Sequence, residues 1–194
     1  MSPTLPSKPN LPKIGASQIA LLEQLSNAVA VSGDEREVRS IVLEAVKPYA
    51  DEVHVDALGN VLATCKAKVK NPLRVMLDAH MDEVGFMIVA DEGDGIFAFE
   101  VVGGVDERQL PGKSVLVGRD HIPGVIGAKP IHLAEGNELH TSIPLNSMRV
   151  DVGPGAAAKV FAGDWGTFAT RFQRSGPSLM GKALDDRIGV ATLI

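Results

Sequence analysis

Apolar residues recur at helical spacing in two segments near the start of the chain. In residues 17–28 they lie three or four positions apart, as on one face of an α-helix. A second segment of this kind spans residues 38–45 and ends near Pro48, a residue that cannot continue a helix. Ser32 precedes this segment, and Glu35 follows three residues later. The pattern predicts a capping box in which Ser32 caps the second helix. We therefore expect both acids, Asp34 and Glu35, to be structural.

Strand patterns follow the two predicted helices. Residues 52–56 and 61–65 alternate between apolar and polar on either side of a Leu-Gly-Asn turn, which predicts a hairpin. Residues 73–77 form a continuous apolar run directly after a proline, and a short run bounded by a turn signal is typical of a buried strand. We therefore expect residues 73–80 to form a central strand of an α/β layer.

Beyond residue 86 the pattern changes to short apolar stretches that alternate with glycine and proline turns. Regularly spaced short strands are typical of a small barrel or sandwich. The fold class predicted is therefore an α/β domain interrupted by an all-β insertion. The expected parts are a leader, residues 1–13, with a proline at every third position; an α/β domain, residues 14–86 and 175–194; and a β-barrel-like insertion domain, residues 87–174.

Composition narrows the possible functions. The formal net charge is −5 and aromatic residues make up 4% of the 194-residue chain. Neither the charge nor the aromatic content is typical of a nucleic-acid-binding protein. Cys65 is the single cysteine, so no disulfide can form within the chain, and a reducing, cytoplasmic location fits. No apolar run approaches the roughly 18 residues of a membrane helix.

Two polar clusters carry the candidate chemistry. Asp78, His80 and Asp82 follow the apolar run, and side chains two residues apart in an extended chain share a face. A histidine held by a carboxylate is a common metal ligand, although polar residues at a strand end can also simply meet solvent. Asp185 and Asp186 are adjacent. They could start a helix, where negative charge is favourable, or supply a carboxylate that bridges two metal ions.

The chain resembles the amino-terminal part of the M42 metalloaminopeptidases, the glutamyl and deblocking aminopeptidase group that has also been labelled endoglucanase M. Several short stretches match the family's pattern in order, which is far more specific than any one of them. They are SGDE (32–35), DALGN (56–60), DAHMDEVGF (78–86), VVGG (101–104), IPGVIGAKPIH (122–132), GD (163–164) and GKALDDRIG (181–189).

The resemblance implies a site of two metal ions. His80 matches a metal ligand, and Asp82 matches the catalytic acid that orients this histidine. Asp185 matches the carboxylate that bridges the two metals, joined to Asp186 by a cis peptide. The family's general base and remaining ligands would lie beyond Ile194, so the chain as given is expected to be an amino-terminal fragment that is inactive alone.

The same resemblance implies the cofactors and partners. Two divalent ions, Zn²⁺ or Co²⁺, would serve the hydrolysis of peptide substrates from their N-termini. Self-association through the β insertion domain into a homo-oligomer is expected, without nucleic acid or membrane as a partner.

Two other functions remain open at this point. A glycosidase needs two carboxylates that flank a sugar bond, and it leaves the pattern of His80 and Asp185 unexplained. A non-enzymatic assembly module, built on the β insertion of a truncated chain, would need no metal. Aminoacyl-nitroanilide against cellulose hydrolysis distinguishes the first alternative, and metal titration with sizing distinguishes the second.

Overall fold

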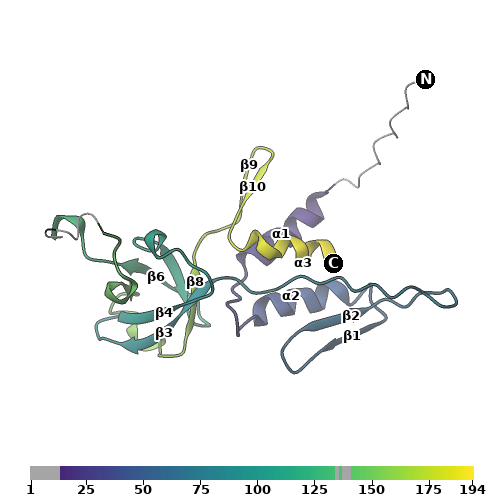
Figure 1. Cartoon of the computed structure of the whole chain (residues 1–194), viewed down its shortest axis with the longest axis horizontal. Helices are drawn as coiled ribbons and strands as arrows, with labels where there is room; N and C mark the ends of the chain where they lie inside the picture. The colour runs from purple at the N-terminus through teal and green to yellow at the C-terminus, as the bar shows by residue number, and fades with distance from the viewer. Residues whose placement is uncertain (1–13, 134–135, 137–140) are drawn as a thin grey trace, which may run out of the picture.

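The computed structural model describes residues 14–133, 136 and 141–194. The predicted leader, residues 1–13, lies outside the described residues. The chain forms two parts side by side, a β-barrel at one end and a group of helices and hairpins at the other (Figure 1). Among the described helices, none has the length and apolar character needed to cross a membrane.

A closed six-stranded barrel forms the middle of the chain, and this confirms the predicted fold class. All its strand pairs are antiparallel, and neighbours follow the order β3-β4-β7-β6-β5-β8 around the barrel. The strands are β3 (Gly85–Asp91), β4 (Ile96–Val102), β5 (Ser114–Val117), β6 (Ile122–Gly127), β7 (Arg149–Asp151) and β8 (Trp165–Phe168). Short 3-10 helices lie in the connections: η1 (Glu107–Gln109), η2 (Ile131–Leu133), η4 (Leu145–Ser147) and η5 (Ala157–Lys159).

The barrel interior is filled with side chains. Alternate residues are buried along β4, β5 and β7, as the period of two requires, whereas the adjacent residues Gly166 and Thr167 are both buried in β8. Phe86 packs edge-on against Phe99, with ring centroids 5.3 Å apart. Opposite the Phe86 ring lies Gly166, where a Cβ atom would come within 2.2 Å of the ring. Other buried core residues include Ile88, Phe97, Leu110, Val115, Val117, Ile126, Met148 and Val150.

The second part has its own core between three helices. Leu25, Val38 and Val190 are buried there, one from each helix. The helices are α1 (Ala16–Asn27), α2 (Arg36–Val46) and α3 (Leu184–Leu193). Two hairpins accompany them, the predicted one of β1 (Glu52–Val55) with β2 (Val61–Thr64), and a second of β9 (Gln173–Ser175) with β10 (Ser178–Met180).

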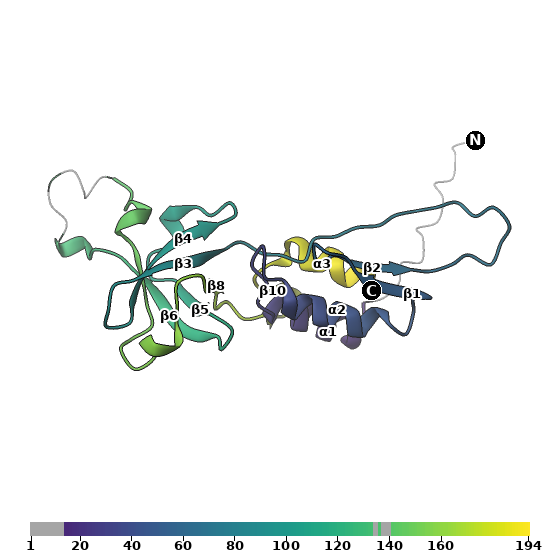
Figure 2. The ribbon, with the colours of Figure 1, turned by 90° about the horizontal axis from the view of Figure 1, so that it is seen from below.

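The central strand expected at residues 73–80 does not form. This segment runs extended beside the helices without strand hydrogen bonds (Figure 2). Leu73 is 87% exposed, Met76 84% and Leu77 73%. A strand needs hydrogen-bonded neighbours, and no segment within the described ranges pairs with this one. The apolar pattern therefore marks a surface that could be buried, and no described residue covers it.

The predicted capping box is also wrong. Helix α2 begins at Arg36, four residues after Ser32, and its N-cap residue is Glu35, which makes no side-chain cap hydrogen bond. The carboxylate of Glu35 instead accepts a hydrogen bond from the Gly33 amide (2.6 Å) and contacts Arg39 (3.3 Å). Glu35 is structural, as expected, but the hydroxyl group of Ser32 is left for another partner.

Candidate functional site

His80 lies between two aspartates. Its Nδ1 atom is 2.7 Å from Oδ1 of Asp82. Its Nε2 atom is 3.2 Å from Oδ1 of Asp185, which is 105 positions away in the sequence. The structure thus brings the three predicted site residues together, whereas Asp78 is exposed and does not line their cleft.

Backbone contacts position the two halves of this cluster. The segment that carries Asp82 is held by a parallel bridge between Val31 and Glu83, and by a hydrogen bond from the Glu83 amide to the carbonyl of Ala30 (2.8 Å). Asp185 lies in the first turn of α3, and its peptide bond to the next residue is cis. Helix α3 packs on α1 and so brings this turn beside His80.

A buried ionic cluster lies directly beneath the site. The Nζ atom of Lys182 is 2.6 Å from the Glu83 carboxylate, and the Arg187 guanidinium is 3.5 Å from it. These side chains are 6%, 4% and 0% exposed. Lys182 also donates to the carbonyl of Ala28 (2.7 Å), and Arg187 donates to the carbonyl of Leu25. Because buried charges must be paired, this cluster joins the start of the barrel to α1 and α3.

The two acidic neighbours of His80 shift its pKa. Partial burial lowers the pKa of His80, whereas the hydrogen bonds to the carboxylates of Asp82 and Asp185 raise it. The second effect is larger, so the pKa lies above its ordinary value. Burial raises the pKa of Asp82, and hydrogen bonds from Ser32 and His80 outweigh this and lower it. Asp82 therefore stays ionised and can hold a proton on Nδ1 of His80.

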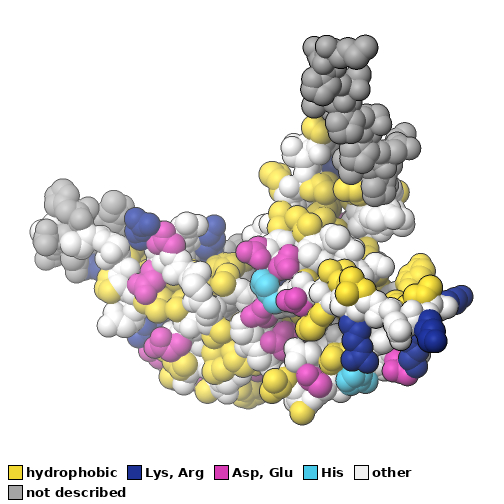
Figure 3. Space-filling model, turned by 45° about the vertical axis from the view of Figure 1, so that its right-hand side comes forward, with side chains coloured by type: hydrophobic (Ala, Val, Ile, Leu, Met, Phe, Trp, Pro, Cys, Tyr) yellow, Lys and Arg dark blue, Asp and Glu magenta, His cyan; other side chains and the backbone are white. Residues whose placement is uncertain are grey.

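The three residues open into a cleft of about 430 Å³ between the barrel and the helices. Val84, Gly103 and Phe168 line its barrel side, and residues 182–185 line the opposite side. Figure 3 shows acidic side chains gathered around a histidine near the middle of the displayed face. The Asp185 side chain is 96% exposed and His80 is 55% exposed, so both remain accessible to a ligand.

His80 and Asp185 fit a metal ion as two donors of a larger set. Imidazole and carboxylate are the ligands that Zn²⁺ and Co²⁺ accept, and with the proton on Nδ1 held by Asp82, Nε2 would be free to bind an ion placed between it and Asp185. No group of three or more histidine, cysteine or acidic side chains with metal-binding geometry occurs in the part of the chain that the structure describes. The pair by itself is thus an incomplete coordination sphere.

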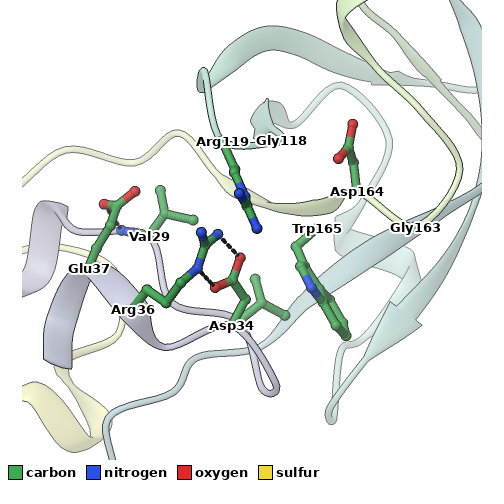
Figure 4. Close-up of a pocket in the computed structure, with 10 residues that line it drawn as sticks. Val29, Asp34, Arg36, Glu37, Gly118, Arg119, Gly163, Asp164 and Trp165 are labelled. Carbon is green, nitrogen blue, oxygen red and sulfur yellow. Dashed lines mark hydrogen bonds and ion pairs between the residues drawn. The ribbon is translucent and has the colours of Figure 1, made fainter. Parts of the chain in front are cut away.

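A second cavity of about 150 Å³ lies at the junction of α2 and the barrel, and shares no lining residue with the cleft. Figure 4 shows Arg36 paired with Asp34 on one side, with Arg119 and Trp165 opposite. Nearby, the ring of His121 contacts Glu37 (2.6 Å). His121 therefore has an acidic side-chain partner at this junction.

The polar groups that support the site are not predicted by the sequence pattern. The pattern predicts that Ser32 caps a helix, but its hydroxyl group donates to Oδ2 of Asp82. Lys182 and Arg187 are buried partners of Glu83. The available signal is a lysine and an arginine on either side of an aspartate pair, but lysine and arginine are usually exposed.

A histidine that is held by a carboxylate at Nδ1 and faces a second carboxylate in a cleft is typical of metal-dependent hydrolases. The sequence pattern of the M42 glutamyl aminopeptidases matches residues 59–194, and the chain belongs to that family. Members of this family are metal-dependent.

Two characterised relatives show how much of a family member is present. The lysyl aminopeptidase of Pyrococcus furiosus is 32% identical over 90% of this chain and 52% of its own length. The glutamyl aminopeptidase of Lactococcus lactis is 30% identical over 89% of this chain and 52% of its own. The chain spans about half the length of the curated relatives it matches.

Solved structures give the same picture of the fold. A TET aminopeptidase from the marine sediment archaeon Thaumarchaeota archaeon SCGC AB-539-E09 matches with a TM-score of 0.83 and 33% identity, over 91% of this chain and 52% of that protein. The Pyrococcus horikoshii TET1 peptidase, which can assemble into a tetrahedron or a large octahedral shell, matches with a TM-score of 0.78 and 30% identity, over 91% and 54%.

Proposed function

We propose that this chain supplies one part of the active site of a two-metal aminopeptidase, which removes N-terminal residues from peptides. The observation that supports this most is the convergence of His80 and Asp185 on one point, with Asp82 behind the histidine. His80 and Asp185 would be two of the ligands that hold the metal ions. Asp82 would hold the Nδ1 proton and so keep Nε2 free.

When bound, two divalent cations such as Zn²⁺ or Co²⁺ would supply Lewis acidity, polarising the scissile carbonyl and lowering the pKa of a water molecule. The chain's own residues would bind the metal ions and orient the peptide. Val84, Gly103 and Phe168 form the barrel wall of the cleft in which a peptide would lie.

We also propose that the 194-residue chain does not turn over peptides by itself. General-base assistance is worth roughly 10²–10⁴-fold in rate, and with His80, Asp82 and Asp185 assigned to the metal site, Glu83 is the remaining acid among the residues that line the cleft. Glu83 is the glutamate nearest His80 in the sequence, but its side chain is 4% exposed and is engaged by Lys182, Arg187 and the Ala30 amide. Glu83 lines the cleft, but its carboxylate could accept a proton from a water molecule there only by giving up these partners.

The proposed domain division follows the prediction, with residues 87–174 as the insertion and residues 14–86 and 175–194 as the α/β part. The barrel strands run from Gly85 to Phe168, which supports an insertion in the middle of the chain and moves its start two residues earlier than predicted, to Gly85. We propose that the insertion mediates self-association, in keeping with the shells formed by the Pyrococcus horikoshii relative.

Metal binding tests the site. Titration of the chain with Co²⁺, followed by visible absorption and calorimetry, should show weak binding that His80→Ala and Asp185→Asn each abolish. His54→Ala is the matched control, because His54 is exposed on the β1–β2 hairpin and its loss should change nothing. Co²⁺ binding that survives both site variants would show that His80 and Asp185 are not the ligands.

Activity tests the catalytic proposal. The chain with Zn²⁺ or Co²⁺ should not hydrolyse aminoacyl-nitroanilides above the metal-only rate. A chimera in which residues 14–194 replace the matching half of the Lactococcus lactis glutamyl aminopeptidase should hydrolyse them, and should lose activity with His80→Ala. Turnover by the 194-residue chain alone would mean that the base or the ligands have been misplaced, and cellulose hydrolysis would favour the glycosidase alternative.

A further inference from the structure

The hydroxyl group of Ser32 donates a hydrogen bond to Oδ2 of Asp82, 50 positions away in the sequence. The other carboxylate oxygen, Oδ1, contacts Nδ1 of His80 (2.7 Å). Each oxygen of Asp82 thus has one side-chain partner, and the three residues form a chain of hydrogen bonds that ends at Nε2 of His80, 3.2 Å from Asp185.

The backbone holds Ser32 in place for this contact. Val31, the residue before it, pairs with Glu83, the residue after Asp82, in the parallel bridge between the two segments. Gly33, the residue after it, has a φ of 97°, a conformation that favours glycine and turns the chain away toward α2. Ser32 and Asp82 therefore face each other because of two backbone features.

A carboxylate held at one oxygen can rotate about its χ2 torsion, which is a broad, soft coordinate. A second hydrogen bond at the other oxygen fixes the carboxylate plane, and with it the direction from which the imidazole must approach. Asp82 and Ser32 are both partly buried, so water competes less well for these hydrogen bonds than at an exposed site.

We propose that Ser32 is a positioning residue. Its hydroxyl group orients the Asp82 carboxylate, and through Asp82 it fixes the Nδ1–H tautomer and the ring orientation of His80. The importance of this for metal binding rests on the proposed function, whereas the orientation of His80 can be measured without metal.

The first measurement is long-range ¹H–¹⁵N NMR of the metal-free chain at a pH above the His80 pKa. In the wild type the closer carboxylate, Asp82 at 2.7 Å from Nδ1, should favour the Nδ1–H tautomer over the Nε2–H tautomer that Asp185, 3.2 Å from Nε2, would favour. In Ser32→Ala the ratio of Nδ1–H to Nε2–H should fall about three- to tenfold, the size expected for losing one hydrogen bond. Ser32→Cys, a near-isosteric variant with a weak donor, should resemble Ser32→Ala, and Ser32→Thr should resemble the wild type.

The matched control is Ser40→Ala. Ser40 is an exposed serine whose hydroxyl donates within α2 to the carbonyl of Arg36 (2.9 Å), so its removal should leave His80 unchanged. An unaltered tautomer ratio in both Ser32→Ala and Ser32→Cys would overturn the proposal, because a purely structural serine predicts that result.

The second measurement is the Co²⁺ dissociation constant in a double-mutant cycle. Ser32→Ala should weaken Co²⁺ binding about three- to tenfold, and Asp82→Asn about 10–100-fold. In the Asp82→Asn background, Ser32→Ala should have no further effect, because it acts through Asp82. If Ser32→Ala weakened Co²⁺ binding equally in the wild-type and Asp82→Asn backgrounds, Ser32 would not act through Asp82 and the proposal would be overturned. A changed tautomer ratio without any Co²⁺ binding would contradict the proposed metal site and leave the role of Ser32 intact.

Discussion

The barrel and the helical part differ in how completely their apolar side chains are buried. In the barrel every strand pairs with two neighbours, and residues such as Phe97 and Ile126 are completely buried. In the helical part Leu25 is equally buried, but Leu73 and Leu77 lie exposed on an extended segment without a strand partner in the described ranges. Closure is what distinguishes the two parts.

An apolar pattern therefore predicts which surface of a segment can be buried. Whether that surface is buried depends on a neighbouring segment that packs against it. A barrel supplies partners to all of its own strands because the last strand pairs with the first. An α/β layer gains them from segments far apart in the sequence, and the segment 73–77 has none among the described residues.

The largest effect is expected in the barrel core. Phe97→Ala should lower the free energy of unfolding by about 3–5 kcal/mol, since it removes a fully buried ring from a closed core. Phe161→Ala is the matched control, because Phe161 is 62% exposed and its loss should change stability by no more than about 0.5 kcal/mol. Urea unfolding measures both, and equal losses would show that the barrel core is not as described.

The buried ionic cluster tests how the helical part is joined to the barrel. Glu83→Gln should lower the free energy of unfolding by about 3 kcal/mol, because it leaves Lys182 and Arg187 buried without a negative partner. Glu52→Gln, which breaks the exposed pair with Lys66, is the control and should have no measurable effect. A harmless Glu83→Gln would contradict the structural role of the cluster.

A smaller effect is expected at the junction cavity. The hydrogen bond from Arg36 holds the pKa of Asp34 below 3.8. The ionised form therefore stabilises the fold above pH 3.8, and this contribution is lost as the pH falls through the folded-state pKa. Wild type should exceed Asp34→Asn in stability by less than about 1 kcal/mol at neutral pH, and the two should converge in acid. A constant difference from neutral to acid pH would contradict this assignment.

The smallest effect is expected at the exposed segment. Leu77→Ala should change the free energy of unfolding by no more than about 0.5 kcal/mol, because Leu77 is 73% exposed. Leu110→Ala is the comparison from the barrel, where Leu110 is 2% exposed, and should cost about 2–5 kcal/mol. A large loss from Leu77→Ala would mean that this segment is buried, as its sequence pattern alone predicts.

Elements whose signals are local could be predicted from the amino-acid sequence. The two helices, the hairpin at β1 and β2, and the series of short strands between glycine and proline turns could all be predicted from periodicity, because each depends on residues a few positions apart. The motifs around His80 and Asp185 could likewise be recognised, although their spacing said nothing of how the two would meet.

The remaining features depend on contacts between segments that are far apart in the sequence. The contacts of Ser32 with Asp82, and of Lys182 and Arg187 with Glu83, span 50 to 104 positions. The same serine fits a local capping pattern, and the choice between the two depends on which acceptor the folded backbone brings to its hydroxyl group. The exposure of residues 73–77 was decided in the same way, because hydrophobic and hydrogen-bonding groups are satisfied by neighbours in space, which a pattern along the chain does not identify.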